Sequence, residues 1–338
     1  MDIRNRGALK NAAAQKLASA DFDPRRLVLV HTLITVGVTL LTLIIDKLLD
    51  NAIANYGGLS GLNTSATLSA IQSLVSFAPT LMALFWDAGY IYSMMRIARG
   101  ESTGYRDLPE GFRRWGKVLT YNLLWFLLIF GVSMGAAVVA TTIFMMTPLS
   151  TPLMEMTTQG LENGTIAADG TILDESLIAA FTEASMPMML LIVIVFAVLL
   201  LVMSYPFRLG LYALLDGKKG AFAAMGTSAQ LMRGNKAALF KLDLSFWWYY
   251  LLTAAVSILA YLDQLLPMFG VSLPIGTEAA GYLAYGIYIV ALLVLYLLAR
   301  NRVETTYVLF YDALREKAAP ISAPDPAPQP RNRPWNYG

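Results

Sequence analysis

Six long apolar stretches alternate along the chain with short polar segments. The stretches cover residues 27–49, 68–97, 118–146, 187–215, 240–262 and 277–299. Each is longer than the roughly 20 residues that a helix needs to cross a bilayer. Their apolar positions run continuously, without the in–out alternation of barrel strands, so they predict helices. We therefore predict an all-α polytopic membrane bundle, with six transmembrane helices in a single domain over residues 1–317.

The positive charges lie in four clusters, and two apolar stretches separate each cluster from the next. The clusters fall at residues 4–26, 96–117, 208–241 and 300–333, and of the lysines and arginines only Lys47 lies elsewhere. Short loops rich in Lys and Arg stay on the cytoplasmic side of a membrane. Both termini are therefore expected in the cytoplasm. The segments on the opposite side are acidic, and the largest of these outer loops is predicted at residues 147–186.

Composition supports a membrane location and narrows the chemistry. The chain is 57% hydrophobic and 14% charged, whereas a soluble domain has about 25% charged residues. The first 26 residues have no short apolar core before a cleavage site, so the first apolar stretch is expected to be a retained span. The basic clusters flank membrane spans, so membrane topology explains them before nucleic acid does, and the basic face should lie against anionic lipid headgroups.

Several kinds of catalytic site are excluded or disfavoured. The absence of cysteine excludes disulfides, thiol nucleophiles and Cys-based metal sites. The single histidine, His31, is at the inner end of the first span and is expected to be a packed or interfacial side chain rather than a base or ligand. No zinc-protease, nucleophile-elbow or P-loop pattern occurs. The sequence thus predicts no enzymatic activity, no metal and no cofactor.

The chain also shows a pattern that favours a threefold repeat, with units of about 1–99, 100–216 and 217–317. Each unit has an amphipathic cytoplasmic segment, a span going out and a span coming back. The apolar faces of these segments lie at Leu9, Ala13 and Leu17, then at Leu108, Phe112, Trp115 and Leu119, and then at Phe222, Met225, Ala229 and Met232. Such helices lie in the membrane interface or pack beneath a bundle.

The returning spans resemble one another near their cytoplasmic ends. Each has an ionisable residue, then a small residue, then a tyrosine: Asp87-Ala88-Gly89-Tyr90, Arg208-Leu209-Gly210-Leu211-Tyr212 and Glu304-Thr305-Thr306-Tyr307. Internal repeats are common in transporter folds. The alternative is coincidence, since short aromatic and small-residue patterns recur in membrane proteins.

Asp87 is the sharpest chemical feature of the sequence. It precedes Arg96 by nine residues, and the helical rise therefore places it about 13 Å inside the charged end of its span. Arg208 is at a similar depth and is the predicted partner, with Glu304 as a third candidate nearer the surface. One interpretation is a polar pocket for a proton, an ion or a polar substrate. The other is a buried ion pair that fixes the register of two helices.

Small residues and prolines mark three further features. Pro79 and Pro206 each remove a backbone donor, so a helix kink is expected at both. Gly131, Gly135 and Ala136 form a close-packing face that is expected to pack within the chain. Prolines recur throughout residues 318–338, which predicts a disordered tail with some polyproline II character.

One segment carries a family resemblance. Residues 224–248 read AMGTSAQLMRGNKAALFKLDLSFWW, and the distinctive positions are Ser228, residues 231–234, Lys236, residues 239–240, residues 244–246 and Trp248. They resemble the signature of a bacterial integral membrane family catalogued as domain of unknown function 975. The segments at residues 96–100 and 111–112 are similar to its earlier cytoplasmic part. The resemblance covers residues 1–317, without the 147–186 loop and the tail, and implies an inner-membrane protein with no established activity.

Two functional hypotheses remain open on the sequence alone. The first is a non-enzymatic scaffold of the bacterial inner membrane that binds a protein partner or tunes the membrane through its basic face. The second is a small transporter or permease-like protein that uses Asp87, Arg208 and Glu304. A water-accessible polar cavity that reaches the charged site would favour transport, and a dry, paired site would favour the scaffold.

Overall fold

The fold is a bundle of helices. A computed structural model describes residues 2–56, 62–166, 175–217, 219–268 and 276–318. All regular elements in these ranges are helical, which confirms the predicted all-α membrane bundle. Apart from Ala318, the tail predicted at residues 318–338 lies outside the described residues.

Five helices in the described ranges are long and apolar enough to span a membrane. The first three are α2 (Pro24–Tyr56), α3 (Leu62–Arg99) and α5 (Trp115–Met145). The fourth joins α7 (Glu175–Ser204) to α8 (Gly210–Asp216), and the fifth joins α13 (Thr277–Leu295) to α14 (Asn301–Ala318). A sixth span results if α10 (Lys236–Leu244) and α11 (Trp247–Leu259), which meet at a bend of 61°, cross as one broken helix.

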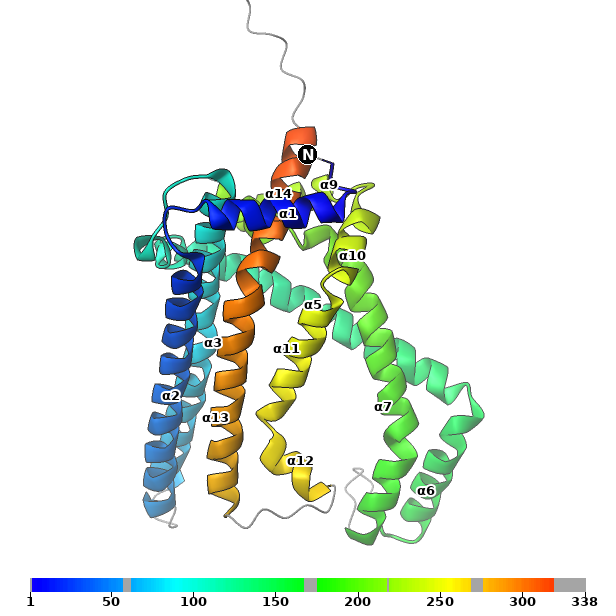
Figure 1. Ribbon diagram of the computed structural model, residues 1–338. Helices are drawn as coiled ribbons and strands as arrows, with labels where there is room; N and C mark the ends of the chain where they lie inside the picture. Colours follow the sequence, from blue (N-terminus) through cyan, green and yellow to red (C-terminus); the bar gives the residue numbers. More distant parts are fainter. Residues whose placement is uncertain (1, 57–61, 167–174, 218, 269–275, 319–338) are drawn as a thin grey trace, which may run out of the picture.

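The spans pair as hairpins. In Figure 1, α2 lies against α3, α5 crosses α7, and α11 runs beside α13 before the short α12 (Leu262–Met268). Their outward faces expose leucine, valine and phenylalanine side chains, as lipid-facing surfaces do. The predicted 147–186 loop is partly helical, because it contains η3 (Pro148–Ser150), α6 (Thr151–Glu162) and the first turns of α7.

The two predicted proline kinks have different outcomes. The 3-10 turn η4 (Tyr205–Phe207) contains Pro206 and separates α7 from α8, so the predicted interruption is confirmed. By contrast, α3 runs as one helix through Pro79. A proline is tolerated within a transmembrane helix when its surroundings satisfy the freed backbone groups.

The sixth predicted span does not end at residue 299. It passes through one π-helical turn, η5 (Tyr296–Arg300), into α14. A π-turn holds an extra residue and so changes the direction of the side chains that follow it, and such turns are frequent at functional sites. Here the turn contains Arg300, which the sequence pattern assigned to a cytoplasmic charge cluster.

A layer of short helices covers the basic end of the bundle. Figure 1 shows α1 (Arg6–Ala18) lying across the long helices, close to α14. In the same way, α4 (Glu110–Arg113) packs on α3, and α9 (Ala221–Leu231) packs on α8. Each amphipathic segment thus rests on the returning span of the preceding unit, and the first unit rests on the third. This arrangement agrees with the cyclic order that a threefold repeat would produce.

The buried face of α9 differs from the predicted one. Ala221, Ala224 and Ser228 are buried, whereas Phe222 is 72% exposed. Because these buried residues are small, α9 can pack closely against the chain around Pro206. The Ser228 hydroxyl forms hydrogen bonds across this close contact. Its Oγ donates to the Pro206 carbonyl at 2.8 Å and accepts from the Leu209 backbone N–H at 3.1 Å.

We expect Ser228→Ala to lower the free energy of unfolding by about 1–3 kcal/mol, because it leaves two backbone groups at the helix break without their partner. Detergent titration of unfolding measures this loss. Ser257→Ala is the matched control, since that exposed hydroxyl bonds only the Thr253 carbonyl of its own helix. Equal losses for the two variants would contradict a role for Ser228 in the break.

Backbone contacts without side chains join the second span to the next amphipathic segment. A Cβ placed on Gly89 would overlap the carbonyl of Leu108, and one on Gly111 would overlap the carbonyl of Phe85. The predicted close-packing face on α5 behaves differently. A Cβ on Gly131 or Gly135 would have no neighbour within 4 Å, so these two glycines do not pack inside the chain as expected.

Candidate functional site

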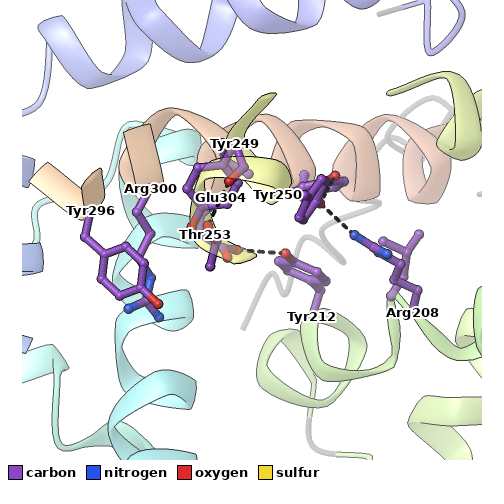
Figure 2. A pocket seen from close by; sticks show the side chains of 11 residues that line it. Arg208, Tyr212, Tyr249, Tyr250, Thr253, Tyr296, Arg300 and Glu304 are labelled. Carbon is purple, nitrogen blue, oxygen red and sulfur yellow. Dashed lines mark hydrogen bonds between the residues drawn. The ribbon is translucent and has the colours of Figure 1, made fainter. Parts of the chain in front are cut away.

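The site is a pocket of about 340 Å³ where α8, α11, η5 and α14 meet. Figure 2 shows eight of its side chains converging from these elements. Two guanidinium groups, one carboxylate and five phenol rings are among the lining groups. The lining residues are Arg208, Leu209, Tyr212, Tyr249, Tyr250, Thr253, Tyr296, Arg300, Val303, Glu304 and Tyr307.

Arg300 occupies one wall and is held on three sides. Its Nη2 donates to Asp87 Oδ1 at 2.7 Å. The guanidinium carbon lies 4.5 Å from the ring centre of Tyr90 and 4.6 Å from that of Tyr296. Stacking on aromatic rings and pairing with a carboxylate are the two interactions that stabilise arginine best in an apolar setting. Arg300 therefore links Asp87, on α3, to the pocket.

His31 completes this wall from α2. Its Nδ1 lies 3.3 Å from Nη1 of Arg300, and its Nε2 lies 2.9 Å from Asp87 Oδ1. An arginine only donates, so Nδ1 accepts and the ring proton is on Nε2, which makes the imidazole neutral. The Nε2 proton does not point well at the carboxylate, because Nε2 lacks a hydrogen bond of good geometry. The packed side chain expected for His31 is observed.

Arg208 forms the opposite wall and belongs to a closed ring of polar contacts. Its Nη2 donates to the Tyr250 hydroxyl at 2.8 Å and lies 3.2 Å from Asp243 Oδ1. The Tyr250 and Tyr307 hydroxyls are 2.5 Å apart, and Tyr307 donates to Asp243. Because Tyr307 gives its one proton to Asp243, Tyr250 must donate to Tyr307. Every group in the ring is then satisfied.

Glu304 lies between the two walls, on α14. Its Oε2 accepts from the Tyr212 hydroxyl at 3.0 Å. Across the described residues, no lysine, arginine or histidine comes within ion-pair distance of this carboxylate. Within the described part of the chain, the Glu304 carboxylate thus has no direct ion-pair partner, and Arg300 and Arg208 act on it only from a greater distance.

The structure brings the three predicted site residues to one place but changes their pairing. Arg208 and Glu304 both line the pocket, and Asp87 reaches it through Arg300. The predicted Asp87–Arg208 pair was wrong, since Asp87 pairs with Arg300 and Arg208 with Asp243. Similar distances from the charged ends of their spans made Arg208 a plausible partner, but Arg300 of η5 lies beside Asp87, and Arg208, between η4 and α8, lies beside Asp243.

Sequence reasoning missed several residues of the site. The sequence pattern places Arg300 in a cytoplasmic charge cluster, and it singles out neither Tyr249 nor Tyr250 as a site residue. The signal for Arg300 was present, because it follows directly on the last apolar stretch. Asp243 was also available as a lone carboxylate inside the fifth apolar stretch.

A second network ties the three returning spans together at their cytoplasmic ends. Arg99, at the end of α3, binds Asp312 of α14 through two hydrogen bonds of 2.6 and 3.1 Å and binds Asp216 of α8 at 2.7 Å. Arg315 and Tyr311 also donate to Asp216. This network links α3, α8 and α14, and the last two of these helices also contribute residues to the pocket.

That layer is also anchored by a charge. Lys10 of α1 donates to the Ser245 carbonyl at 2.7 Å, at the bend between α10 and α11, and its Nζ lies 4.0 Å from the Phe246 ring centre. Burial, with a smaller effect from the nearby positive charges of Arg302 and Arg6, lowers the pKa of Lys10. Lys10 thus donates a hydrogen bond to a carbonyl that has no helical N–H partner at the bend.

The chemistry open to the pocket is binding of a charged or polar group. Among the described residues, no three His, Cys, Asp or Glu side chains are grouped so that they could hold a metal ion. The side chains offer hydroxyl donors, aromatic faces, two guanidinium groups and one carboxylate.

Comparison with known proteins supports a family assignment and no more. The family described as "Protein of unknown function (DUF975)" matches residues 1–318. No curated protein and no solved structure matches the chain.

Proposed function

We propose, for a chain that belongs to the DUF975 family, the role of a non-enzymatic, permease-like protein of a bacterial cytoplasmic membrane. In this role the pocket between the returning spans takes up a small polar ligand. The observation that supports it is the pocket itself, because Arg208 between η4 and α8, Arg300 of η5 and Glu304 of α14 line one space inside an apolar bundle. Ionisable residues at membrane depth commonly mark substrate and ion pathways.

The interrupted helices around the pocket support the same proposal. The helices are irregular at the 3-10 turn η4 and the π-turn η5 and are bent between α10 and α11, and all three places are close in sequence to lining residues. Transporters place their binding sites at such discontinuities, where free backbone groups and side chains meet. Helices that only support the fold do not require three irregular segments close to one pocket.

Labelling of a cysteine in the pocket tests this function. We expect Thr253→Cys, in a chain that has no native cysteine, to react with a water-soluble thiol reagent added to membranes from at least one side. Thr253 is suitable because its hydroxyl bonds only the Tyr249 carbonyl of its own helix. The reactive form of a thiol is the thiolate, which forms in a watery pocket but not in lipid.

The matched control is Val193→Cys on α7, whose side chain is 61% uncovered by protein and faces the expected lipid. It should stay unlabelled under the same conditions. Absence of labelling at position 253 from both sides would end the permease proposal.

A scaffold remains the second candidate, and a separate observation favours it. Exposed Phe222, Trp115 and Trp247 lie on or beside the layer of short helices, among basic residues. Apolar anchors mixed with lysine and arginine suit anionic lipid surfaces. A crosslinking experiment that recovers no specific protein or lipid on this layer would count against it.

A further inference from the structure

The charges around the pocket do not balance. Three carboxylates, Asp87, Asp243 and Glu304, face two guanidinium groups, Arg208 and Arg300. The imidazole beside Arg300 is neutral, for the reason given above. With all three acids ionised, the described cluster has one negative charge too many. An uncompensated charge at membrane depth is costly, so the excess must be removed either by a proton on one of the acids or by a cation in the pocket.

A cation that removes the excess negative charge would lie near Glu304. Each guanidinium already has its own carboxylate and at least one aromatic or hydroxyl partner. The only hydrogen-bond donor shown for Glu304 is the neutral Tyr212 hydroxyl. An anionic ligand would add a second unmatched negative charge to the same space, whereas a cation would neutralise the cluster.

The walls fit a cation that has carbon around its charge. Phenol rings attract cations through their π-electrons, and the pocket already shows this, since Arg300 lies over Tyr296 and Arg208 lies over Tyr307. Tyr212, Tyr249 and Tyr250 also line the pocket, and no lysine or arginine of the described residues lies over their rings. A pocket of about 340 Å³ also has much more room than a bare metal ion fills, and hard metal ions prefer several oxygen ligands to aromatic faces.

We infer that the pocket binds an organic cation, an amine or quaternary ammonium group, with Glu304 as its counter-ion and the rings of Tyr212, Tyr249 and Tyr250 as its aromatic wall. This inference rests on the proposed function and specifies its ligand class. The ammonium group can come from a free amine or from the headgroup of an aminophospholipid, and the chemistry recognised is the same.

The test compares the rates at which three thiosulfonate reagents modify Thr253→Cys in the full chain: a trimethylammonium, a neutral methyl and a sulfonate reagent. Each rate is divided by the rate for a free thiol in solution. We expect the cationic reagent to exceed the anionic one by about tenfold, as one unmatched carboxylate at pocket distance implies. Glu304→Gln should bring the two normalised rates to within about twofold.

Ala223→Cys, at an exposed position of α9 in the basic layer, is the control site. It should favour the sulfonate reagent or show no preference, which separates the charge of the pocket from the charge of the protein surface. An equal or faster rate for the sulfonate at position 253, or a preference unchanged by Glu304→Gln, overturns the cation assignment and leaves the permease proposal standing. Modification by none of the reagents overturns both.

Protection identifies the source of the cation. In nanodiscs of phosphatidylglycerol alone, slower modification of Thr253→Cys on addition of tetraethylammonium supports a free amine. Slower modification after phosphatidylethanolamine is mixed into the nanodisc supports a lipid headgroup. If neither slows the reaction, the pocket has a charge preference without a binding site, and the inference fails.

Discussion

Gly89→Ala is expected to lower the free energy of unfolding by about 3 kcal/mol or more. The added Cβ would overlap the backbone carbonyl of Leu108, and a backbone cannot move aside as a flexible side chain can. The second span would have to separate from the 108–112 segment. Unfolding in a detergent titration, followed by circular dichroism, measures the loss.

The same contact can be tested from its other side and against a control. Gly111→Ala should be similarly harmful, because its Cβ would overlap the Phe85 carbonyl. Gly131→Ala should instead be neutral or stabilise the helix by about 0.5–1 kcal/mol, since it adds a good helix former in open space. Wild-type stability of Gly89→Ala, with the control unchanged, would show that the two backbones do not touch.

Arg300→Gln is expected to destabilise the protein by about 3 kcal/mol or more, because it leaves Asp87 without its cation and empties the space between two tyrosine rings. Asp87→Asn should cost less, since 45% of that side chain is not covered by protein. The double variant should recover part of the loss, with a coupling free energy of about 1–3 kcal/mol. Thermal unfolding in detergent of all four proteins completes the cycle.

A second cycle, between Asp87 and Arg208, is the control. Each of these residues has a different partner, so their changes should add to within about 0.5 kcal/mol. Strong coupling in this cycle and none between Asp87 and Arg300 would show that the observed pairing is incorrect.

The sequence singled out three charged residues that the fold brings to one place, but it assigned their neighbours poorly. Hydropathy places a residue along the membrane normal, and on that axis Asp87 and Arg208 do lie near the same level of the bundle as the pocket. Which residues meet also depends on the lateral order and rotation of the helices, which no single stretch encodes. For this reason the sequence predicts that Arg208 pairs with Asp87, whereas in the structure Arg208 pairs with Asp243.

The irregular parts of helices were also hard to predict, each for a local reason. The interruption at Pro206 is predictable, because proline lacks a backbone N–H donor. The π-turn at Tyr296–Arg300 and the bend before Trp247 involve no proline and are stabilised by distant groups, such as Lys10 at the Ser245 carbonyl. Tertiary contacts of this kind cannot be predicted from the pattern of apolar residues. They help to place Arg300, Tyr249 and Tyr250 at the pocket.

The packing of α1 on α14 dictates an order of assembly. The buried face of α1, with Leu9 and Ala13, is completed by a helix that begins only at Asn301. At translation rates of 5–20 residues per second, α1 waits on the order of 15 to 60 s for its partner. Until α14 is made, α1 has its smaller contact with α3 but not its larger one with α14. The pocket therefore comes into existence only when the final helix leaves the ribosome.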